Sequence, residues 1–219
     1  MKRPDRKRPC VLLLCLLLSA CSTTDESKMG PEELFQSGMN KPPTPQTLHS
    51  MAKIMGAQGQ ETLYEVTLRR IIGEYPDFLP AYVDLAELQI RQSRINEAIQ
   101  ILSAGLRMVP EDHILLNDLG MCWLLQENYE EALDLFRQAA ALQPDEARYR
   151  ANMAAALGLS GHYEECLSLY EQVVSPANAH YNLAVLCESR KDFLRAQEEF
   201  QKAEELGGPE DSQDQRQPF

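Results

Sequence analysis

The chain has 219 residues, of which 44% are hydrophobic and 25% are charged, a composition that excludes a wholly disordered chain and a polytopic membrane protein. Its formal net charge of −12 repels phosphate backbones, so nucleic acid is not an expected partner. Six cysteines without a CxxC pair indicate neither a disulfide scaffold nor a zinc or dithiol redox motif.

The first twenty residues have the features of an export signal. Basic side chains at positions 2, 3, 6, 7 and 8 precede an apolar run of nine residues, from Cys10 to Leu18. The run is shorter than the roughly 20 apolar residues that a helix needs to cross a bilayer. We therefore expect residues 1–20 to be a signal peptide rather than a membrane-spanning helix.

The signal runs directly into Leu18-Ser19-Ala20-Cys21, which resembles the lipobox of bacterial lipoproteins. This resemblance implies that Cys21 is the lipidation site and becomes the acylated N-terminus of the mature protein, anchored to the membrane but not spanning it. Ser22 follows where an Asp would mark retention in the inner membrane, so the resemblance implies the outer membrane, facing the periplasm. The alternative is an ordinary signal peptide with a chance cysteine at its cleavage site.

Residues 21–44 are mostly polar and end in Lys41-Pro-Pro-Thr44, so we expect a flexible tether between Cys21 and a folded domain. One short apolar patch, Leu34 and Phe35, interrupts this tether. Together with the preceding Pro31-Glu32-Glu33, it is expected to start a short helix that caps the next domain.

A period of 34 residues dominates the rest of the chain. Four columns of residues follow it: Pro76, Pro110 and Pro144; Met51, Leu85, Leu119 and Met153; Ala52, Ala86, Gly120 and Ala154; and Leu68, Leu102, Phe136 and Tyr170. Within each period the apolar spacing predicts two amphipathic helices, joined at polar or Gly-containing breaks such as Gln126-Glu127-Asn128. Small residues such as Gly120 and Ala132 are expected where the paired helices cross.

The period shortens once, because Tyr181-Asn-Leu-Ala184 follows Ala151-Asn-Met-Ala154 after only 30 residues. One repeat is therefore expected to be four residues short, with its second helix ending near Val174 and a turn at Ser175-Pro176. Phe200 continues the aromatic column in the last repeat. The predicted repeats are residues 45–78, 79–112, 113–146, 147–176 and 177–206, followed by a polar tail at 207–219.

This pattern resembles the tetratricopeptide repeat, which places Trp or Leu, Leu-Gly, an aromatic, Ala, Phe, Ala and Pro at set positions. The best copy, 113–146, fills them with Leu116, Leu119, Gly120, Trp123, Ala132, Phe136, Ala139 and Pro144. The resemblance implies an all-α right-handed solenoid of about five helix-turn-helix repeats, whose first helices line a concave groove that holds a peptide or a partner helix.

A row of short polar side chains recurs on this predicted groove, one position before the Leu-Gly column. Its members, the candidate partner-binding residues, are Asp84, Asp118, Asn152 and Asn182. An amide both donates and accepts hydrogen bonds, and in peptide-binding members of the family an Asn here commonly contacts the ligand backbone. The alternative is that these residues are solvent-facing fillers.

Patterns that carry catalysis are not found in the sequence. The four histidines do not recur at helical spacing, and GxSxG, P-loop, GxGxxG and HExxH motifs do not occur. We therefore predict no enzyme activity, no catalytic residue, no metal site and no cofactor. The cysteines of the repeats are expected in the core, and whether Cys166 and Cys187 pair stays open.

The combination of lipobox, short tether, about five repeats and a shortened fourth repeat resembles the TadD-type assembly lipoproteins of tight-adherence (Flp) pilus systems. The resemblance implies a non-enzymatic scaffold that helps the outer-membrane secretin or neighbouring pilus-assembly proteins to localise or assemble. The alternative is a general periplasmic adaptor lipoprotein that docks peptidoglycan hydrolases or proteases.

Overall fold

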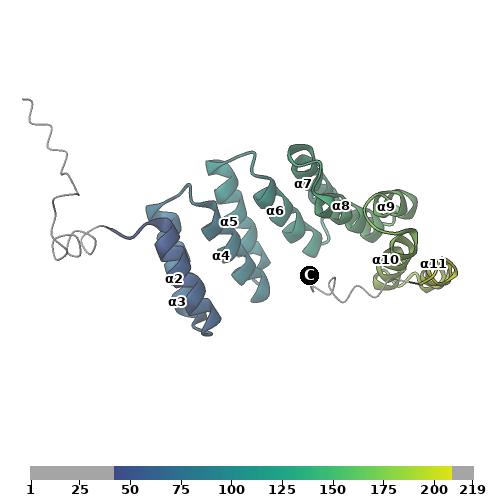
Figure 1. Ribbon diagram of the computed structural model, residues 1–219, viewed down its shortest axis with the longest axis horizontal. Helices are drawn as coiled ribbons and strands as arrows, with labels where there is room; N and C mark the ends of the chain where they lie inside the picture. The colour runs from purple at the N-terminus through teal and green to yellow at the C-terminus, as the bar shows by residue number, and fades with distance from the viewer. Residues whose placement is uncertain (1–41, 209–219) are drawn as a thin grey trace, which may run out of the picture. The chain divides into compact units, whose positions relative to one another are not determined.

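The computed structural model describes residues 42–208, which form ten helices and no strand (Figure 1). The helices form five pairs: α2 (Pro45–Ala57) with α3 (Glu61–Glu74), α4 (Leu79–Arg91) with α5 (Ile95–Met108), α6 (His113–Leu125) with α7 (Tyr129–Leu142), α8 (Ala147–Ser160) with α9 (Tyr163–Tyr170), and α10 (Pro176–Ser189) with α11 (Phe193–Glu205). The expected all-α solenoid of five repeats is confirmed. The expected signal peptide, Cys21, nearly all of the tether and residues 209–219 lie outside the described part.

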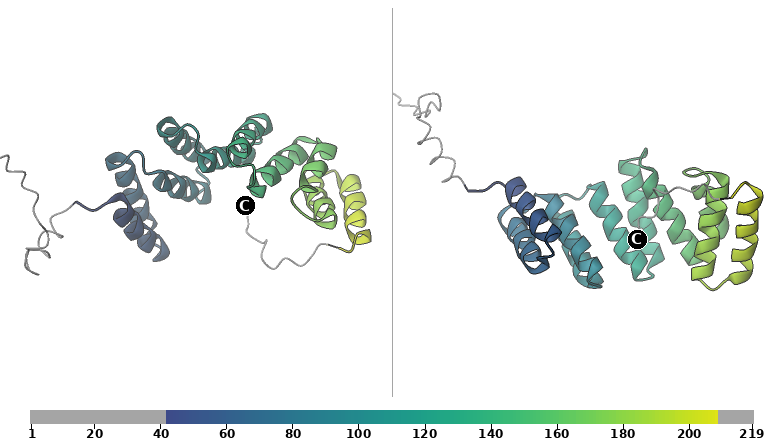
Figure 2. Two further views of the ribbon diagram at one scale, coloured as in Figure 1. Left: turned by 45° about the horizontal axis from the view of Figure 1, so that its top comes forward. Right: turned by 60° about the horizontal axis from the view of Figure 1, so that its bottom comes forward.

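Each helix packs against the next one along the chain, both within a pair and from the second helix of one pair to the first helix of the following pair (Figure 2). The repeat columns supply the core of this stack. Leu68, Leu102 and Phe136 are fully buried, and Tyr170 is nearly so. Burying one such side chain contributes about 1.5–3 kcal/mol, so the recurring column is a main source of stability.

Gly120 lets α6 and α7 approach closely. A Cβ atom at this position would lie 2.6 Å from Phe136 Cε1, and one at Gly105 would lie 2.8 Å from Leu115 Cδ1. Both distances are below van der Waals contact, so the small residues of the repeat are required where large side chains of the neighbouring helix fill the space.

The fourth repeat is short because α10 begins early. Ser175 caps α10 by accepting a hydrogen bond from the Asn178 N–H, and Pro176 occupies the first turn. Helix α9 ends at Tyr170, four residues before the expected Val174. The residues after Tyr170 form a turn. The fifth helix pair therefore starts at Pro176, one residue before the expected boundary.

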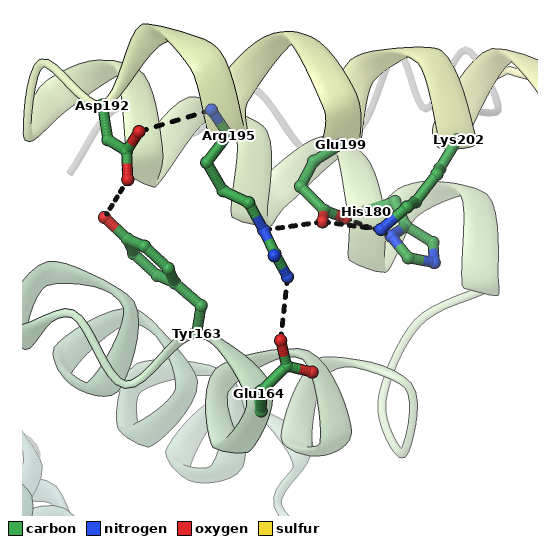
Figure 3. Close-up of polar contacts among 7 residues, drawn as sticks. All are labelled: Tyr163, Glu164, His180, Asp192, Arg195, Glu199 and Lys202. Atoms are coloured by element: carbon green, nitrogen blue, oxygen red, sulfur yellow. Dashed lines mark hydrogen bonds and ion pairs between the residues drawn. The ribbon is translucent and has the colours of Figure 1, made fainter.

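A buried carboxylate holds the last helix pair together (Figure 3). Glu199 of α11 is fully buried; its Oε2 lies 2.5 Å from His180 Nδ1, and its Oε1 lies 2.9 Å from both Lys202 Nζ and Arg195 Nε. Arg195 extends this cluster to α9 by donating to Glu164 Oε1 at 2.9 Å. Burial alone would raise the pKa of Glu199, but the hydrogen bonds from His180 and Lys202 and the nearby positive charges outweigh it and lower the pKa.

The sequence analysis places Phe200, not Glu199, in the core column of this repeat. In the structure Phe200 is half-buried and its ring meets that of Tyr181, with centroids 5.5 Å apart. The helix rotates this way because the face that packs on α10 carries Ala196, Glu199 and Ala203. The carboxylate there bonds to His180 and Lys202 and forms an ion pair with Arg195.

The three cysteines of the repeats are free, buried thiols, as expected for core positions. Burial raises the pKa of Cys122 and of Cys166 to about 12, so neither is a thiolate at neutral pH. In this structure Cys166 and Cys187 are not paired.

Gly120→Ala is expected to destabilise the protein by about 1–3 kcal/mol, because the new methyl group would force the buried Phe136 ring out of its place. Gly73→Ala in α3 is the matched control: its Cβ would meet no atom within 4 Å, so the change should stabilise by about 0.5–1 kcal/mol. Urea midpoints with an unchanged m-value measure both effects. Equal effects at the two glycines would contradict the close approach at Gly120.

Glu199→Gln is expected to cost about 3 kcal/mol at pH 7, because it removes the buried charge that pairs with Arg195 and Lys202. Since folding lowers the pKa of Glu199, its contribution is complete above the ordinary value of 4.5 and is lost as the pH falls through the lower folded-state pKa. Urea unfolding at pH 7 and pH 3 should show the wild-type advantage shrinking. Glu205→Gln, at an exposed position, should show almost no difference at either pH.

Candidate functional site

The four candidate groove residues lie at one register position of the first helices α4, α6, α8 and α10. All four are partly buried rather than freely solvated. Exposed apolar side chains lie at helical spacing from two of them: Ile114 precedes Asp118 by four residues, and Val185 follows Asn182 by three. Tyr181, next to Asn182, is also exposed. The surface thus combines polar atoms for backbone recognition with apolar area.

Asp84 joins the first and second repeats. Its Oδ2 lies 2.8 Å from His49 Nε2 of α2, accepts a hydrogen bond from the Tyr64 hydroxyl of α3 at 3.0 Å and lies 3.8 Å from Lys53 Nζ. Burial, the charge of Asp84 and this hydrogen bond together raise the pKa of Tyr64. Three groups contact Oδ2, whereas Oδ1 of Asp84 has no side-chain partner among residues 42–208 and can accept a hydrogen bond from a ligand.

A chain of hydrogen bonds joins α8 to α6 and ends at Asp118. Asn152 Nδ2 donates to Asn117 Oδ1 at 2.7 Å, and Asn117 Nδ2 donates to Asp118 Oδ1 at 3.1 Å. Asn117 is buried, so it holds both candidate residues in fixed orientation. A second contact between the same helices, His113 Nδ1 to the Tyr149 hydroxyl at 2.5 Å, fixes their spacing.

Asn117 was missed by the sequence analysis. Its column contains His49, Val83, Ala151 and Tyr181, so no residue type recurs there and periodicity gives no signal. The one feature of the sequence that could have indicated its role is its position, as a polar residue between the buried Leu116 and the candidate Asp118.

Asp118 is a partly buried carboxylate, and that burial disfavours its ionised form. Burial raises its pKa, and the hydrogen bond from Asn117 and the charge of Arg148 only partly offset that effect. Within residues 42–208, Asn117 supplies the one hydrogen bond that Asp118 accepts. A partly desolvated carboxylate with free acceptor capacity favours the binding of an N–H donor, such as a peptide amide or a basic side chain.

Asn182, the fourth candidate, stands apart from this network. It lies on α10 between Tyr181 and Leu183, and the structure shows no hydrogen bond from its side chain to another residue of the described part. The structure therefore brings Asp118 and Asn152 together through Asn117, engages Asp84 with the first repeat, and leaves Asn182 beside the exposed apolar residues of α10.

Two other kinds of feature, a metal-binding cluster and a membrane-spanning helix, are not found within residues 42–208. No group of three or more His, Cys, Asp or Glu side chains there could hold a metal ion. None of the helices in this range is both long enough and apolar enough to span a membrane. The predicted lipidation site, Cys21, lies outside the described residues.

Asp118→Asn is expected to stabilise the protein at pH 7 by about 1 kcal/mol, because it removes a partly buried charge while keeping the acceptor for Asn117. Folding raises the pKa of Asp118, so ionisation costs stability above that raised value and costs nothing below the ordinary value of 3.8. The gain should therefore disappear in urea unfolding at pH 3.5. Asp134→Asn, at an exposed position, serves as control. Destabilisation by Asp118→Asn at pH 7 would show instead that the charge is a structural requirement.

Comparison with known proteins agrees with this architecture. A family profile described as tetratricopeptide repeat matches residues 83–147, from α4 to the start of α8. No curated protein matches the chain at the sequence level. The central repeats thus match the tetratricopeptide repeat, a fold suited to protein–protein interaction.

Solved structures with a similar fold include two MamA structures and YrrB. A MamA protein is 16% identical with a TM-score of 0.60, over 74% of this chain and 91% of that one. MamA 41-end from Desulfovibrio magneticus RS-1 has the same identity and TM-score, over 74% of this chain and 94% of that one. YrrB, described as a TPR protein with an unusual peptide-binding site, is 18% identical with a TM-score of 0.60, over 79% and 91% of the two chains. At such identities the likeness shows the fold.

Proposed function

We propose that this protein is a non-enzymatic scaffold whose surface of first helices binds a segment of a client protein. The observation that carries the proposal is Asp118, a carboxylate whose burial raises its pKa and whose orientation is fixed by Asn117. A charge held in place at a cost to stability is typical of a binding residue rather than of a packing residue. YrrB, a protein of similar fold, is described as having a peptide-binding site, which supports peptide binding as a use of this fold.

The proposed client contact combines two kinds of interaction. Asp118 and Asn152 supply an acceptor and an amide on adjacent first helices, positioned to hydrogen-bond the backbone or a basic side chain of an extended segment. Tyr181 and Val185 of α10 supply exposed apolar area for the side chains of the same segment. Together they fit a client segment that is apolar with basic or backbone N–H donors.

The location proposed for this scaffold is the periplasmic face of the bacterial outer membrane. The lipobox-like Leu18-Ser19-Ala20-Cys21 and the Ser at position 22 support it. Lipid at Cys21 would confine the protein to one leaflet, which raises the effective concentration of a client held near that membrane.

The client system proposed here is the tight-adherence (Flp) pilus apparatus, with the outer-membrane secretin or another pilus-assembly protein as the client. The lipobox, the number of repeats and the shortened fourth repeat support it by resemblance. The alternative, a periplasmic adaptor that docks peptidoglycan hydrolases or proteases, shares the anchor and the groove. The two differ in the protein that is captured.

Asp118→Ala with Asn152→Ala is expected to weaken client binding about tenfold, since it removes two polar contacts worth roughly 0.5–1.5 kcal/mol each. Asp134→Ala with Gln138→Ala, at exposed positions of the second helix α7, is the matched control and should bind normally. Binding is measured by titration with the captured client after circular dichroism confirms folding. Normal binding by the folded groove variant would contradict the groove assignment.

The client is identified by affinity capture from detergent-solubilised envelopes of the native host, with Cys21→Ser beside the wild-type protein. Recovery of a secretin or pilus proteins, reduced when Cys21→Ser detaches the scaffold from the membrane, is the expected result. Recovery of cell-wall hydrolases or proteases would favour the adaptor function. Equal membrane association of the two forms would contradict lipidation at Cys21.

A further inference from the structure

A groove lies on the surface between the second helices α7 and α9. Each of these helices packs on α8, but they make few contacts with each other, so α8 forms the floor between them (Figure 1). Two surface cavities of about 480 and 350 Å³ follow this floor. Both are lined by Arg137, Leu157 and Glu165, so they adjoin each other. We call the two cavities together the α7–α9 groove.

The floor of the α7–α9 groove is apolar. Met153 and Leu157, one turn apart on α8, line it together with Leu133 of α7 and Leu169 of α9. Leu133 and Leu157 are buried, whereas Met153 and Leu169 remain partly exposed. An apolar side chain that enters the groove would therefore remove apolar surface of both partners from water, which favours its binding.

The side chain at one register position of the repeat helps to keep this groove open. Leu157 of α8 follows Trp123 of α6 by 34 residues, so the two lie at equivalent positions of neighbouring first helices. Trp123 packs against the core residues on both sides of α6. Leucine is much smaller than tryptophan, so the equivalent space between α7 and α9 is filled less completely.

Carboxylates outnumber basic groups along the edges of the groove. Four carboxylates line it: Glu130 and Asp134 on α7, and Glu164 and Glu165 on α9. Among the residues that line either cavity, Arg137 is the one arginine or lysine, and it pairs with Asp134 at 3.0 Å. Arg195 pairs with Glu164 at 2.9 Å. Glu130 and Glu165, on opposite edges, form no ion pair with another residue of the described part, so they can pair with a cation from outside.

We propose that the α7–α9 groove is a second docking surface, for a segment of another protein that carries apolar side chains flanked by Lys or Arg. The apolar floor accepts the apolar side chains, and Glu130 and Glu165 pair with the basic ones. The excess of negative charge disfavours anionic occupants such as acidic lipid headgroups. The groove follows α7 over residues 130–137 and α9 over residues 162–169, so a segment of about two helical turns fills it.

This surface is separate from the candidate groove residues of the first helices. Asn152 and Met153 are neighbours on α8, so their side chains point about 100° apart around the helix axis. The inference therefore does not rest on the proposed function. A scaffold with both surfaces holds one segment on its first helices and another on its second helices, which raises the effective concentration of two proteins for each other.

Titration of the mature protein with a synthetic peptide tests the charge complementarity. The probe is an amphipathic peptide of about 12 residues made of Leu and Lys, and the same pattern made of Leu and Glu is its charge control. Glu130→Gln with Glu165→Gln is expected to weaken binding of the Lys peptide about three- to tenfold, because two exposed ion pairs are lost.

Glu97→Gln with Glu131→Gln is the matched control for this double variant. Both residues are exposed, lie at the Glu165 register position of α5 and α7, and line neither cavity. The control removes the same charge from the same turn of a second helix. Its affinity for the Lys peptide should therefore equal that of the wild-type protein.

A bulky side chain in the groove tests the position of binding. Ser168 of α9 is exposed and lines the larger cavity. Ser168→Trp is expected to weaken binding of the Lys peptide more than about tenfold, because the indole would cover the apolar floor. Gln138→Trp, at an exposed position of α7 that lines neither cavity, should bind normally. Circular dichroism and urea midpoints confirm that both variants fold.

Three results of these titrations would overturn the proposal. The first is no binding of the Lys peptide up to about 1 mM. The second is equal binding by the wild-type protein and every variant, which would mean unspecific attraction to an acidic chain. The third is equal binding of the Glu peptide, which would contradict the charge complementarity.

A dimer would also overturn the proposal. If size-exclusion chromatography shows a wild-type dimer that Ser168→Trp dissociates, a second copy of the chain covers the groove instead of a basic segment. None of these results bears on client binding through Asp118 and Asn152, so failure here is separate from failure of the proposed function.

Discussion

The packing of each first helix from α4 to α10 between two second helices is the interaction on which the rest of this structure depends. Helices of 8 to 14 residues are too short to be stable in isolation, so each one depends on the apolar face of its neighbours. That requirement explains why Gly120 must lie against Phe136 and why the large column from Leu68 to Tyr170 is buried. It also makes the two ends of the stack special, because an end helix lacks one neighbour.

The two ends meet this requirement differently. At the C-terminal end, α11 exposes Glu198, Gln201 and Glu205 together with the apolar Phe193 and Leu194, and a buried carboxylate rather than an aromatic ring secures its inner face. At the N-terminal end, α2 exposes the apolar Met51 and Ile54. Both end helices of the described part therefore expose apolar side chains beside polar ones.

The same packing leaves one side of each first helix for binding. Because α6 and α8 are held together by Asn117 and Tyr149, the candidate atoms of Asp118 and Asn152 keep their positions without a ligand. Such pre-organisation reduces the entropy lost on binding. A scaffold of this kind contributes a rigid surface, and a lipid anchor would add confinement to the membrane.

The sequence by itself determined the helical repeat, its period and its one irregularity. Each repeat packs in the same way, so the same residue types recur in a column even where a single repeat departs from the pattern. It located the break at Gln126-Glu127-Asn128 and the buried column from Leu68 to Tyr170 correctly, since small and large residues recur at set positions. It could not place Glu199 in the core, because that depends on the basic side chains around its carboxylate. It could not predict that α9 ends at Tyr170, because that depends on the early start of α10.

For the candidate surface, the sequence determined which column faces outward but not which of its members are engaged. Asp84, Asp118, Asn152 and Asn182 look equivalent in the chain, yet only the tertiary structure decided that Asp84 bonds to the first repeat while Asn152 and Asp118 share the buried Asn117. The reason is physical. A column reports the position of a side chain along a helix, whereas its hydrogen bonds and its desolvation depend on non-repeating residues of the neighbouring helices.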